Sequence, residues 1–398
     1  MNSRLRLLAP FVALLVVFAV RPIAAADHNT LTHEEIADGW ILLFDGESLF
    51  GWEAATKADW RVADGAIVVS SGEPGLLNTT SRFADYVLKV DFRSAKGTNS
   101  GVFLRTDKKP KNPKEGCYEL NIADFGTTPF ATGSLVSRGE KAKVAENLDS
   151  AEWQSFEVRC EGKHINIRVD GKQVLDYTEE LDPKPSLVGH VGLQLNSGKV
   201  EFRNVKLKPL SQKPLFNGKN LDGWVPHPDL KNAFSVGAEG VLHAKGGKSQ
   251  LESTTKFGDF TLQLAARANA PRNNSGLFFR SIPGEVMNGY ECQLQNCYGK
   301  DDKPNPVDCG TGGICRRAIA RKLVAKDGEW FHLALVADGP HMAAWVNGYQ
   351  VSDFTDTREP HANPRNGLRT VPGTFILQAH DETTDFSFRN IQAAELPK

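Results

Sequence analysis

The stretch Phe44-Asp45-Gly46-Glu47-Ser48-Leu49-Phe50-Gly51-Trp52 returns later in the chain as Phe216-Asn217-Gly218-Lys219-Asn220-Leu221-Asp222-Gly223-Trp224. Four further elements recur in the same order: Asn99–Arg105 as Asn274–Arg280, Tyr118-Glu119 as Tyr290-Glu291, Glu152-Trp153 as Glu329-Trp330, and Phe202–Val205 as Phe388–Ile391. An ordered set of this kind predicts one domain present twice. We expect domains over residues 38–210 and 213–397, joined by a short proline-bearing linker.

Within each half the local pattern is that of short β-strands. Apolar residues alternate with polar ones over Tyr86–Phe92 and over Phe260–Ala266, which is the period of a half-buried strand. Asp170-Gly171 and Asn347-Gly348 follow similar alternations, and both dipeptides tolerate the positive φ of tight hairpin turns. The pattern predicts an all-β fold of two tandem antiparallel β-sandwiches of the jelly-roll type.

The bulk composition excludes some partners. The 398 residues suit two domains better than one. A formal net charge of -1 provides no general field that would recruit nucleic acid or an anionic membrane.

Residues 1–26 are predicted to be a signal peptide. Arg4 and Arg6 precede an apolar run from Leu7 to Val20, and Ala24-Ala25-Ala26 provides the small residues of a cleavage site near Ala26. The run is short of the roughly 20 residues that a membrane span needs, although an uncleaved N-terminal anchor is the alternative. We therefore expect a secreted or periplasmic protein with no other membrane segment.

The six cysteines divide unevenly between the halves: Cys117 and Cys160 in the first, and Cys292, Cys297, Cys309 and Cys315 in the second. Export would allow disulfides, and the crowding suggests bridges that pin the loop after Cys297, although the sequence does not choose among the pairings. Zinc is the alternative, but paired C-x-x-C elements and a nearby histidine are missing. We predict no metal and no cofactor; loop carboxylates could hold Ca²⁺, but no EF-hand-like run supports it.

Polar side chains share faces of the strands expected in the second half. Glu291, Gln293 and Gln295 point one way, and Gln378 and His380 share a face of a later strand. Such a surface can form a hydrogen-bonding floor for a hydroxyl-rich ligand. The alternative is the solvated outer face that antiparallel sheets commonly have.

Two arginines belong to the same pattern. Arg280 ends the strand after Asn274-Ser275-Gly276, and Arg389 follows the apolar Phe388. The repeated pairs Arg105 with Glu119 and Arg280 with Glu291 could also be ion pairs that brace neighbouring strands.

The repeated motifs, in their order, resemble those of the 3-keto-disaccharide hydrolase domain family. They are Phe-Asp/Asn-Gly-x-x-Leu-x-Gly-Trp, Asn-Ser-Gly-x-x-x-Arg, Tyr-Glu, Thr-Gly (Thr132–Leu135 and Thr311–Ile314), Glu-Trp and Phe-Arg-Asn-Val/Ile. The resemblance implies a sandwich similar to concanavalin A and laminin G. It also implies cleavage, by hydrolysis or elimination, of glycosides whose sugar carries a ketone at C3.

Carried onto this sequence, the resemblance favours the second half as the reactive one. Its implied catalytic residues are Glu291 or His380 as base or acid, and Arg280 as the group that stabilises negative charge. The implied substrate-binding residues are Gln293, Gln295, Gln378 and Arg389, with Arg105, Glu119 and Asn121 in the first half.

The halves differ at one of these positions. The first half has Asn196 where the second has His380, which leaves open whether the first half is catalytic, whereas its Arg105, Glu119 and Asn121 can still bind carbohydrate. Two longer loops of the second half could wall a cleft with basic residues: Arg316, Arg317, His361, Arg365 and Arg369.

Two other functions are compatible with the same residues. A noncatalytic carbohydrate-binding protein would bind glycans without turning them over, and an adhesion or scaffold module would have no sugar site, because a fold does not fix a function.

Overall fold

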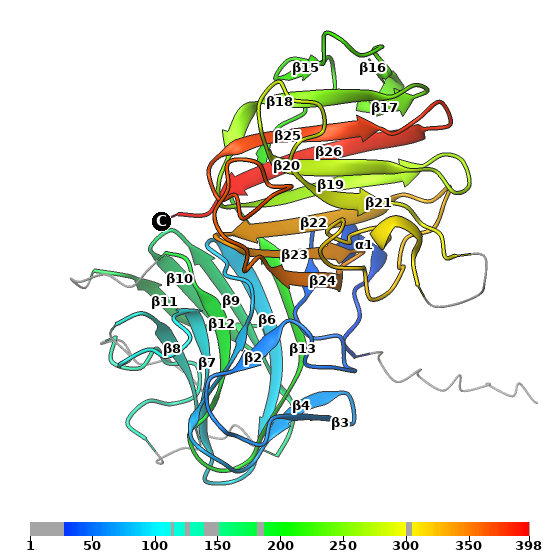
Figure 1. Ribbon diagram of the computed structural model, residues 1–398. Coiled ribbons are helices and arrows are strands. Elements are labelled where there is room, and N and C mark those ends of the chain that lie inside the picture. Colours follow the sequence, from blue (N-terminus) through cyan, green and yellow to red (C-terminus); the bar gives the residue numbers. More distant parts are fainter. Residues whose placement is uncertain are drawn as a thin grey trace, which may run out of the picture.

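The computed structural model describes residues 28–112, 115–123, 128–138, 151–180, 187–299 and 305–397 (Figure 1). The predicted signal peptide lies outside these ranges. The described chain forms two β-sandwiches, with one short α-helix, α1 (His33–Ala37), and two 3₁₀ turns, η1 (Ala238–Gly240) and η2 (Val307–Cys309). Within these ranges no helix has the length and apolar character that a bilayer-spanning segment requires.

The first sandwich consists of thirteen strands: β1 (Ile41–Leu42), β2 (Trp52–Ala54), β3 (Arg61–Ala63), β4 (Ala66–Val69), β5 (Gly75–Thr79), β6 (Tyr86–Ser94), β7 (Asn99–Thr106), β8 (Tyr118–Ala123), β9 (Gln154–Glu161), β10 (His164–Val169), β11 (Lys172–Thr178), β12 (His190–Leu195) and β13 (Val200–Pro209). One sheet has the order β11-β10-β9-β6-β13-β4-β3, with β1 also paired to β13, and the other has the order β2-β5-β12-β7-β8. Every pairing between these strands is antiparallel.

The second sandwich also has thirteen strands: β14 (Lys213–Pro214), β15 (Trp224–Pro226), β16 (Phe234–Val236), β17 (Leu242–Lys245), β18 (Ser249–Phe257), β19 (Phe260–Ala268), β20 (Ser275–Ser281), β21 (Tyr290–Leu294), β22 (Phe331–Asp338), β23 (His341–Val346), β24 (Tyr349–Thr355), β25 (Gly373–Ala379) and β26 (Asp385–Glu395). Its sheets run β16-β17-β26-β19-β22-β23-β24, with β14 on β26, and β15-β18-β25-β20-β21. Over the residues that the structure describes, the two sandwiches therefore have the same number and order of strands, and the predicted fold class is confirmed.

The motif that recurs at the start of each sandwich forms a turn and places a tryptophan in a buried position. The side chain of Asp45 accepts hydrogen bonds from the backbone of Glu47 and Ser48, and Asn217 does the same for the two residues at Lys219 and Asn220. Each turn leads to a buried tryptophan whose indole N–H donates to a backbone carbonyl nine residues earlier. The motif thus fixes the first edge of each sandwich by local hydrogen bonds and burial.

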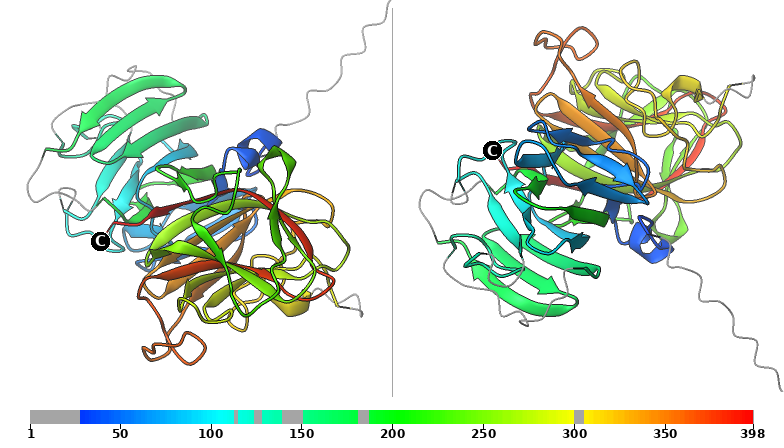
Figure 2. Two further views of the ribbon diagram at one scale, coloured as in Figure 1. Left: turned by 90° about the horizontal axis from the view of Figure 1, so that it is seen from above. Right: turned by 90° about the horizontal axis from the view of Figure 1, so that it is seen from below.

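The outer face of β22 and β23 joins the second sandwich to the first. Ala334, Val336, Ala343 and Trp345 belong to the same buried cluster as the core of the first sandwich, whereas their strand neighbours face the second core. The Trp345 ring is 1% exposed, and its indole N–H donates to the carbonyl of Leu42 at 2.9 Å. Figure 1 shows these strands lying toward the first sandwich, and Figure 2 shows the C-terminal end at the same junction.

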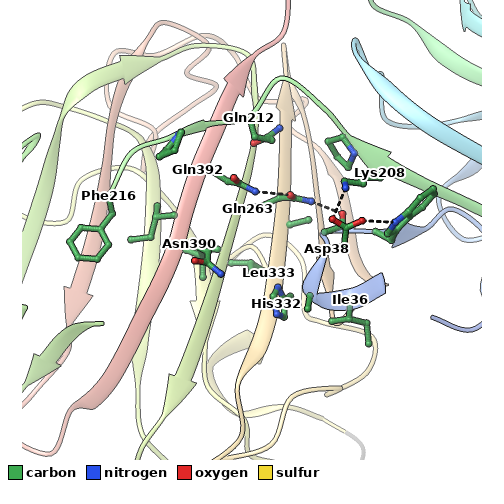
Figure 3. A pocket seen from close by; sticks show the side chains of 18 of the residues that line it. Ile36, Asp38, Lys208, Gln212, Phe216, Gln263, His332, Leu333, Asn390 and Gln392 are labelled. Carbon is green, nitrogen blue, oxygen red and sulfur yellow. Dashed lines mark hydrogen bonds and ion pairs between the residues drawn. The ribbon is translucent and has the colours of Figure 1, made fainter. Parts of the chain in front are cut away.

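A groove of about 880 Å³ lies between the two sandwiches (Figure 3). The groove is crossed by polar contacts between the two parts of the chain: Gln263 donates to the carbonyl of Gly39 at 2.8 Å, and Gln212 of the linker donates to Thr261 Oγ1 at 2.6 Å. Lys208 pairs with Asp38 on its wall. These side chains are engaged in holding α1 and the linker against β19 and β26, so the groove is a seam of the structure and not the candidate site.

Candidate functional site

A cavity of about 680 Å³ lies on the sheet face formed by β20, β21 and β25 in the second sandwich. Four of the predicted residues line it together: Glu291, Gln293, Gln378 and His380. Glu291 and Gln293 come from β21, whereas Gln378 and His380 come from the end of β25. The volume is within the range of small-molecule sites, about 300–1,000 Å³.

A glycine on the central strand makes room for this arrangement. Gly276 on β20 lies between β21 and β25. A Cβ there would approach Glu291 Oε1 to 2.6 Å and Gln378 Oε1 to 3.2 Å. The missing side chain therefore lets the two polar groups from neighbouring strands meet over the middle of the sheet.

The Glu291 carboxyl has an environment that suits proton transfer. Burial raises its pKa to about 7, although the thiol of Cys315 and the nearby His380 and Arg316 favour its charged form. The charge on Cys309 works in the same direction as burial. A carboxyl that titrates near neutral pH can accept and return a proton under ordinary conditions.

His380 is half-exposed at the cavity and is held by the residue beside it. Its Nδ1 lies 2.8 Å from Asp381 Oδ2, and its backbone N–H donates to Thr384. Hydrogen bonds from Thr383 and then from His380 lower the pKa of Asp381 to about 2, so Asp381 is an anion at neutral pH. An ionised carboxylate at Nδ1 orients the ring.

The two glutamines are fixed by their neighbours. Gln293 donates to Asn274 Oδ1 at 2.8 Å, and Asn274 in turn contacts Asp308. Gln378 lies 3.2 Å from the Met287 sulfur, and its buried Oε1 has no hydrogen-bond partner among the described residues. An unpartnered buried carbonyl oxygen is a binding position that a ligand hydroxyl can satisfy.

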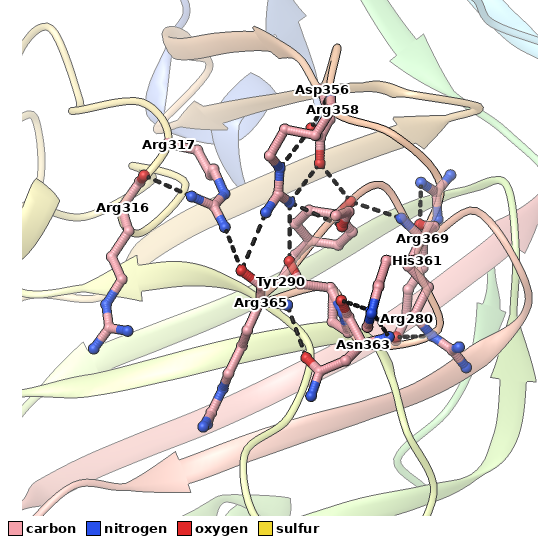
Figure 4. Close-up of polar contacts among 12 residues, drawn as sticks. Arg280, Tyr290, Arg316, Arg317, Asp356, Arg358, His361, Asn363, Arg365 and Arg369 are labelled. Atoms are coloured by element: carbon pink, nitrogen blue, oxygen red, sulfur yellow. Dashed lines mark hydrogen bonds and ion pairs between the residues drawn. The ribbon is translucent and has the colours of Figure 1, made fainter.

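Basic loop residues wall the cavity. Arg316, Arg317 and Arg365 line it, as the sequence suggested, whereas His361 and Arg369 are not among the lining residues. Arg317 donates to the carbonyl of Arg365, which joins the two loops (Figure 4). The cavity rim is therefore positively charged.

A buried carboxylate anchors the second of these loops. Asp356 accepts from the Tyr290 hydroxyl at 2.7 Å and from two nitrogens of Arg358. Arg358 also donates to the carbonyls of Pro364 and Gly367, at 2.9 and 3.0 Å (Figure 4). These bonds hold Arg365 at the rim.

The catalytic role predicted for Arg280 is wrong. Its side chain is fully buried and donates to the carbonyls of Gly258 and Gly339 and to Asp259 Oδ1, at 2.8, 2.6 and 2.8 Å. The reason is a β-bulge: Arg280 has a φ of 47°, and the pairing of β20 with β25 shifts register there. Strict alternation fails at a bulge, so the guanidinium lies away from the Glu291 face.

Arg105 occupies the same position in the first sandwich, and its predicted substrate contact is wrong for the same reason. It has a φ of 47° and donates to the carbonyls of Ala84 and Gly162 and to Asp85, at 2.7, 2.5 and 2.9 Å. In both sandwiches the arginine ties a strand of one sheet to a hairpin turn of the other. The repeated arginine is thus a brace, paired with an aspartate and not with the repeated glutamate.

Replacing Arg280 with alanine is expected to lower the free energy of unfolding by about 3–5 kcal/mol, because a fully buried side chain would be removed and three partly buried acceptors would lose their donor. Urea unfolding followed by tryptophan fluorescence measures the loss, and Arg280→Lys, which retains the charge, should recover part of it. A fully stable but inactive Arg280→Ala variant would restore the catalytic assignment.

Three other predicted binding residues also lie elsewhere. Arg389 belongs to β26 of the opposite sheet, where its guanidinium stacks 4.1 Å from the Trp330 ring. Gln295 is buried beyond the end of β21 and is not among the cavity residues. Asn121, on β8, is buried and donates to the carbonyl of Phe130 in the loop that follows. The prediction that these three residues bind substrate is therefore wrong.

The first sandwich has a smaller pocket at the corresponding place. Its volume is about 360 Å³, and Glu119 and Gln194 line it on either side of Gly101. Gln194 donates to Glu119 at 3.3 Å, and burial raises the pKa of Glu119. The pocket has the carboxyl and the amide of the second sandwich, but Asn196 stands where His380 would be and does not line it.

All six cysteines fall within the described ranges, and all are free thiols. The bridges expected after Cys297 are not formed, although Cys309 and Cys315 approach to 3.7 Å. Among the described residues, no group of three or more His, Cys, Asp or Glu side chains could hold a metal ion.

Several cavity residues were not identified from the sequence. Asn274, Met287, Asp308 and the thiols of Cys309 and Cys315 all line the cavity. Asn274 precedes the glycine of the repeated Asn-Ser-Gly motif, and that repetition was an available signal. The others sit in loops of the second half whose path no local pattern specifies.

Comparison with known proteins identifies the family. The profile of the 3-keto-alpha-glucoside-1,2-lyase-like domain matches residues 39–208 and again residues 211–394. The chain belongs to the 3-keto-alpha-glucoside-1,2-lyase-like domain family. The resemblance seen in the ordered motifs is thus confirmed, and it places the chain among carbohydrate-acting, glycosyl hydrolase-like proteins.

The individual relatives are only distantly similar to this chain. A 3-keto-disaccharide hydrolase from Bacteroides thetaiotaomicron is 28% identical over 108 residues, which cover 24% of this chain and 37% of that protein. A candidate glycosyl hydrolase of known structure from Parabacteroides distasonis is 24% identical with a TM-score of 0.42, covering 46% of this chain and 100% of its own. A carbohydrate-binding module from Bacillus subtilis is 17% identical with a TM-score of 0.31, covering 40% and 95%.

Proposed function

We propose that the chain cleaves the glycosidic bond of glycosides whose sugar carries a ketone at C3, in the cavity of the second sandwich, after export directed by residues 1–26. The observation that carries the proposal is the Glu291 carboxyl, whose pKa is raised to about 7, in a cavity shared with His380. The family match supports the class of substrate.

Cleavage of a 3-keto glycoside requires a general base at C2, and it does not require the pair of carboxylates that an ordinary glycosidase uses. A C3 carbonyl acidifies the C2 proton, and the oxygen at C1 lies β to that carbonyl. Glu291 as a carboxylate removes the C2 proton, and the electron pair forms the enolate between C2 and C3. When the enolate collapses, a C1–C2 double bond forms and the C1–O bond breaks.

The remaining groups handle charge and the leaving group. The His380 ring, oriented by Asp381, donates a proton to the departing oxygen. Arg316 and Arg317 take the role first given to Arg280 and place positive charge near the enolate oxygen. Gln293 and Gln378 hold the sugar hydroxyls. Addition of water to C1 completes hydrolysis, whereas release before that addition makes the reaction an elimination.

The test is to incubate the protein with 3-keto-trehalose, 3-keto-lactose and their unoxidised parents, and to identify products by mass. We expect cleavage of the 3-keto sugars only, since the parents have no acidified C2 proton. Substitution His380→Asn, which installs the residue found in the first sandwich, should reduce kcat by about 10²–10⁴-fold. Full activity in this variant would contradict the role of His380.

A second candidate function is carbohydrate binding without turnover in the first sandwich. The observation that favours it is the pocket holding Glu119 and Gln194 without a histidine. Binding of a glycan that Glu119→Gln weakens, with no product formed by the chain, would support it.

A further inference from the structure

The cavity of the second sandwich contains two thiols that the proposed reaction does not use. Cys309 Sγ and Cys315 Sγ lie 3.7 Å apart, and both side chains line the cavity. Both are partly exposed, whereas the other four cysteines, Cys117, Cys160, Cys292 and Cys297, are buried. The pair is therefore open to a reagent that enters the cavity.

The backbone around these thiols does not require sulfur. The amide of Cys315 donates to the carbonyl of Glu291 at 2.8 Å, and the amide of Val136 makes the same bond to Glu119 in the first sandwich at 2.9 Å. Counted from the Thr-Gly elements, Phe130 takes the place of Cys309. The same frame thus exists with apolar side chains, so the thiols are an addition particular to the second sandwich.

The two thiols differ in reactivity. The hydrogen bond from Cys315 and the backbone N–H of Arg316, 3.3 Å from the sulfur, lower the pKa of Cys309 to about 6. The neighbouring Cys309 and burial raise the pKa of Cys315. One sulfur is thus a thiolate at neutral pH while its neighbour keeps its proton, which suits an attacking and a resolving pair.

We propose that Cys309 and Cys315 are a redox site, closing to a disulfide and opening again, and that this change acts on Glu291, which lines the same cavity. The oxidant is a low-molecular-weight disulfide. The Cys309 thiolate attacks one of its sulfurs and expels a thiolate. Cys315 then loses its proton, attacks the Cys309 sulfur and expels the second thiolate. The two cysteines thus lose two electrons and the Cys315 proton, and the oxidant becomes two thiols by taking up that proton and one from water.

The loop between the thiols can accommodate the closure. The sulfurs must approach from 3.7 Å to about 2.05 Å. The intervening segment contains Gly310, Gly312 and Gly313, which lets the backbone adjust. Cys309 already has a φ of 73°, a left-handed conformation that costs energy for a residue with a side chain, so this end of the loop is held under strain.

Closure changes the electrostatic surroundings of Glu291. Oxidation removes the S–H of Cys315, which favours the charged carboxyl, and the negative charge of Cys309, which disfavours it. The pKa of Glu291 therefore changes on oxidation, and with it the fraction of the base that is ionised at neutral pH. This consequence for catalysis rests on the proposed function.

The experiment treats the full chain with oxidised glutathione at neutral pH, or with dithiothreitol, and maps the cysteines by peptide mass. The wild-type protein is expected to form a Cys309–Cys315 disulfide without retained glutathione. Cys315→Ser should accumulate glutathione on Cys309, because the resolving thiol is missing. Cys309→Ser should react far more slowly, and Cys117→Ser, a buried thiol of the first sandwich, should behave as the wild type.

Two readouts keep the parts of the inference separate. If both thiols survive oxidised glutathione, or if Cys315→Ser does not trap it on Cys309, the redox site is overturned whatever the protein does to sugars. The pH dependence of unfolding reports the ionisation of Glu291 without a substrate, and it should shift along the pH axis on oxidation. A disulfide that leaves this dependence unchanged would overturn the link to Glu291. Absence of turnover in both forms counts against the proposed function alone.

Discussion

Replacing Glu291 with glutamine is expected to reduce kcat on a 3-keto disaccharide by about 10²–10⁴-fold, which is the usual contribution of a positioned base. The amide has nearly the shape of the carboxyl, so the space over Gly276 remains filled. The wild-type rate should rise with pH through about 7, because the base works only when ionised and its pKa lies there. A pH–rate profile of kcat/KM measures this rising limb.

The same substitution should stabilise the protein at alkaline pH. The pKa of Glu291 is raised from 4.5 to about 7 in the fold, so the folded state holds its proton more tightly than the unfolded chain does. The stabilisation of the fold by the protonated Glu291 is complete below about pH 4.5 and is lost as the pH rises through 7. At pH 8 the wild type buries the charge of Glu291, whereas the Glu291→Gln variant does not. The free energy of unfolding of the variant should therefore be higher by on the order of 3 kcal/mol.

Glu119→Gln is the matched variant in the first sandwich. It changes the corresponding carboxyl beside the corresponding amide, Gln194, in a pocket without the histidine. We expect the loss of turnover for Glu291→Gln alone. A greater loss of turnover from Glu119→Gln would move the reaction to the first sandwich, and retained activity in Glu291→Gln would end the assignment of Glu291 as base.

Trp345→Ala is expected to lower the free energy of unfolding by about 3–5 kcal/mol, as for other buried tryptophans. The ring is 1% exposed, packs near Phe83 with ring centres 6.3 Å apart, and donates to the carbonyl of Leu42. Its removal leaves a cavity and an unpaired carbonyl at the junction of the sandwiches. Calorimetry should show one cooperative transition in the wild type and two separated transitions in the variant.

Trp330→Ala is the control for this effect. Trp330 is half-buried and stacks with Arg267 and Arg389, at 4.9 and 4.1 Å, on the outer face of the second sandwich. We expect Trp330→Ala to lower the free energy of unfolding by only about 1–2 kcal/mol and to leave a single unfolding transition, because the stack joins strands of one sheet. Equal effects of the two substitutions would show that Trp345 does not couple the sandwiches.

The β fold was predictable because its signals are local. Alternation over Tyr86–Phe92, the Asp-Gly and Asn-Gly turns and the recurring tryptophan motif each depend on residues a few positions apart. The same period placed Glu291 and Gln293 on one face of β21, and placed Gln378 and His380 together. That these pairs meet in one cavity follows from β20 lying between β21 and β25. The family motifs supplied the proposed chemistry, which the residues alone did not indicate.

The sequence also contains a signal for the interface between the sandwiches: the alternation of apolar and polar residues breaks down along two strands of the second sandwich. Glu157 and Arg159 on the outer face of β9 correspond to Ala334 and Val336 on β22, and Arg168 on β10 corresponds to Trp345. An apolar run buried on both faces predicts a covered strand. What covers it is a long-range matter that no local pattern specifies.

Alternation determined which way most strand residues point, and it failed where the backbone leaves the regular strand. At Arg280 the left-handed φ turns the guanidinium away from the Glu291 face, and Gly373 accommodates the bulge, since a Cβ there would meet the Arg280 backbone at 2.4 Å. Only the tertiary structure decided this, because a bulge depends on the neighbouring strand. It likewise decided that Cys309 and Cys315 meet beside Glu291, since loop paths follow from the packing of the whole domain.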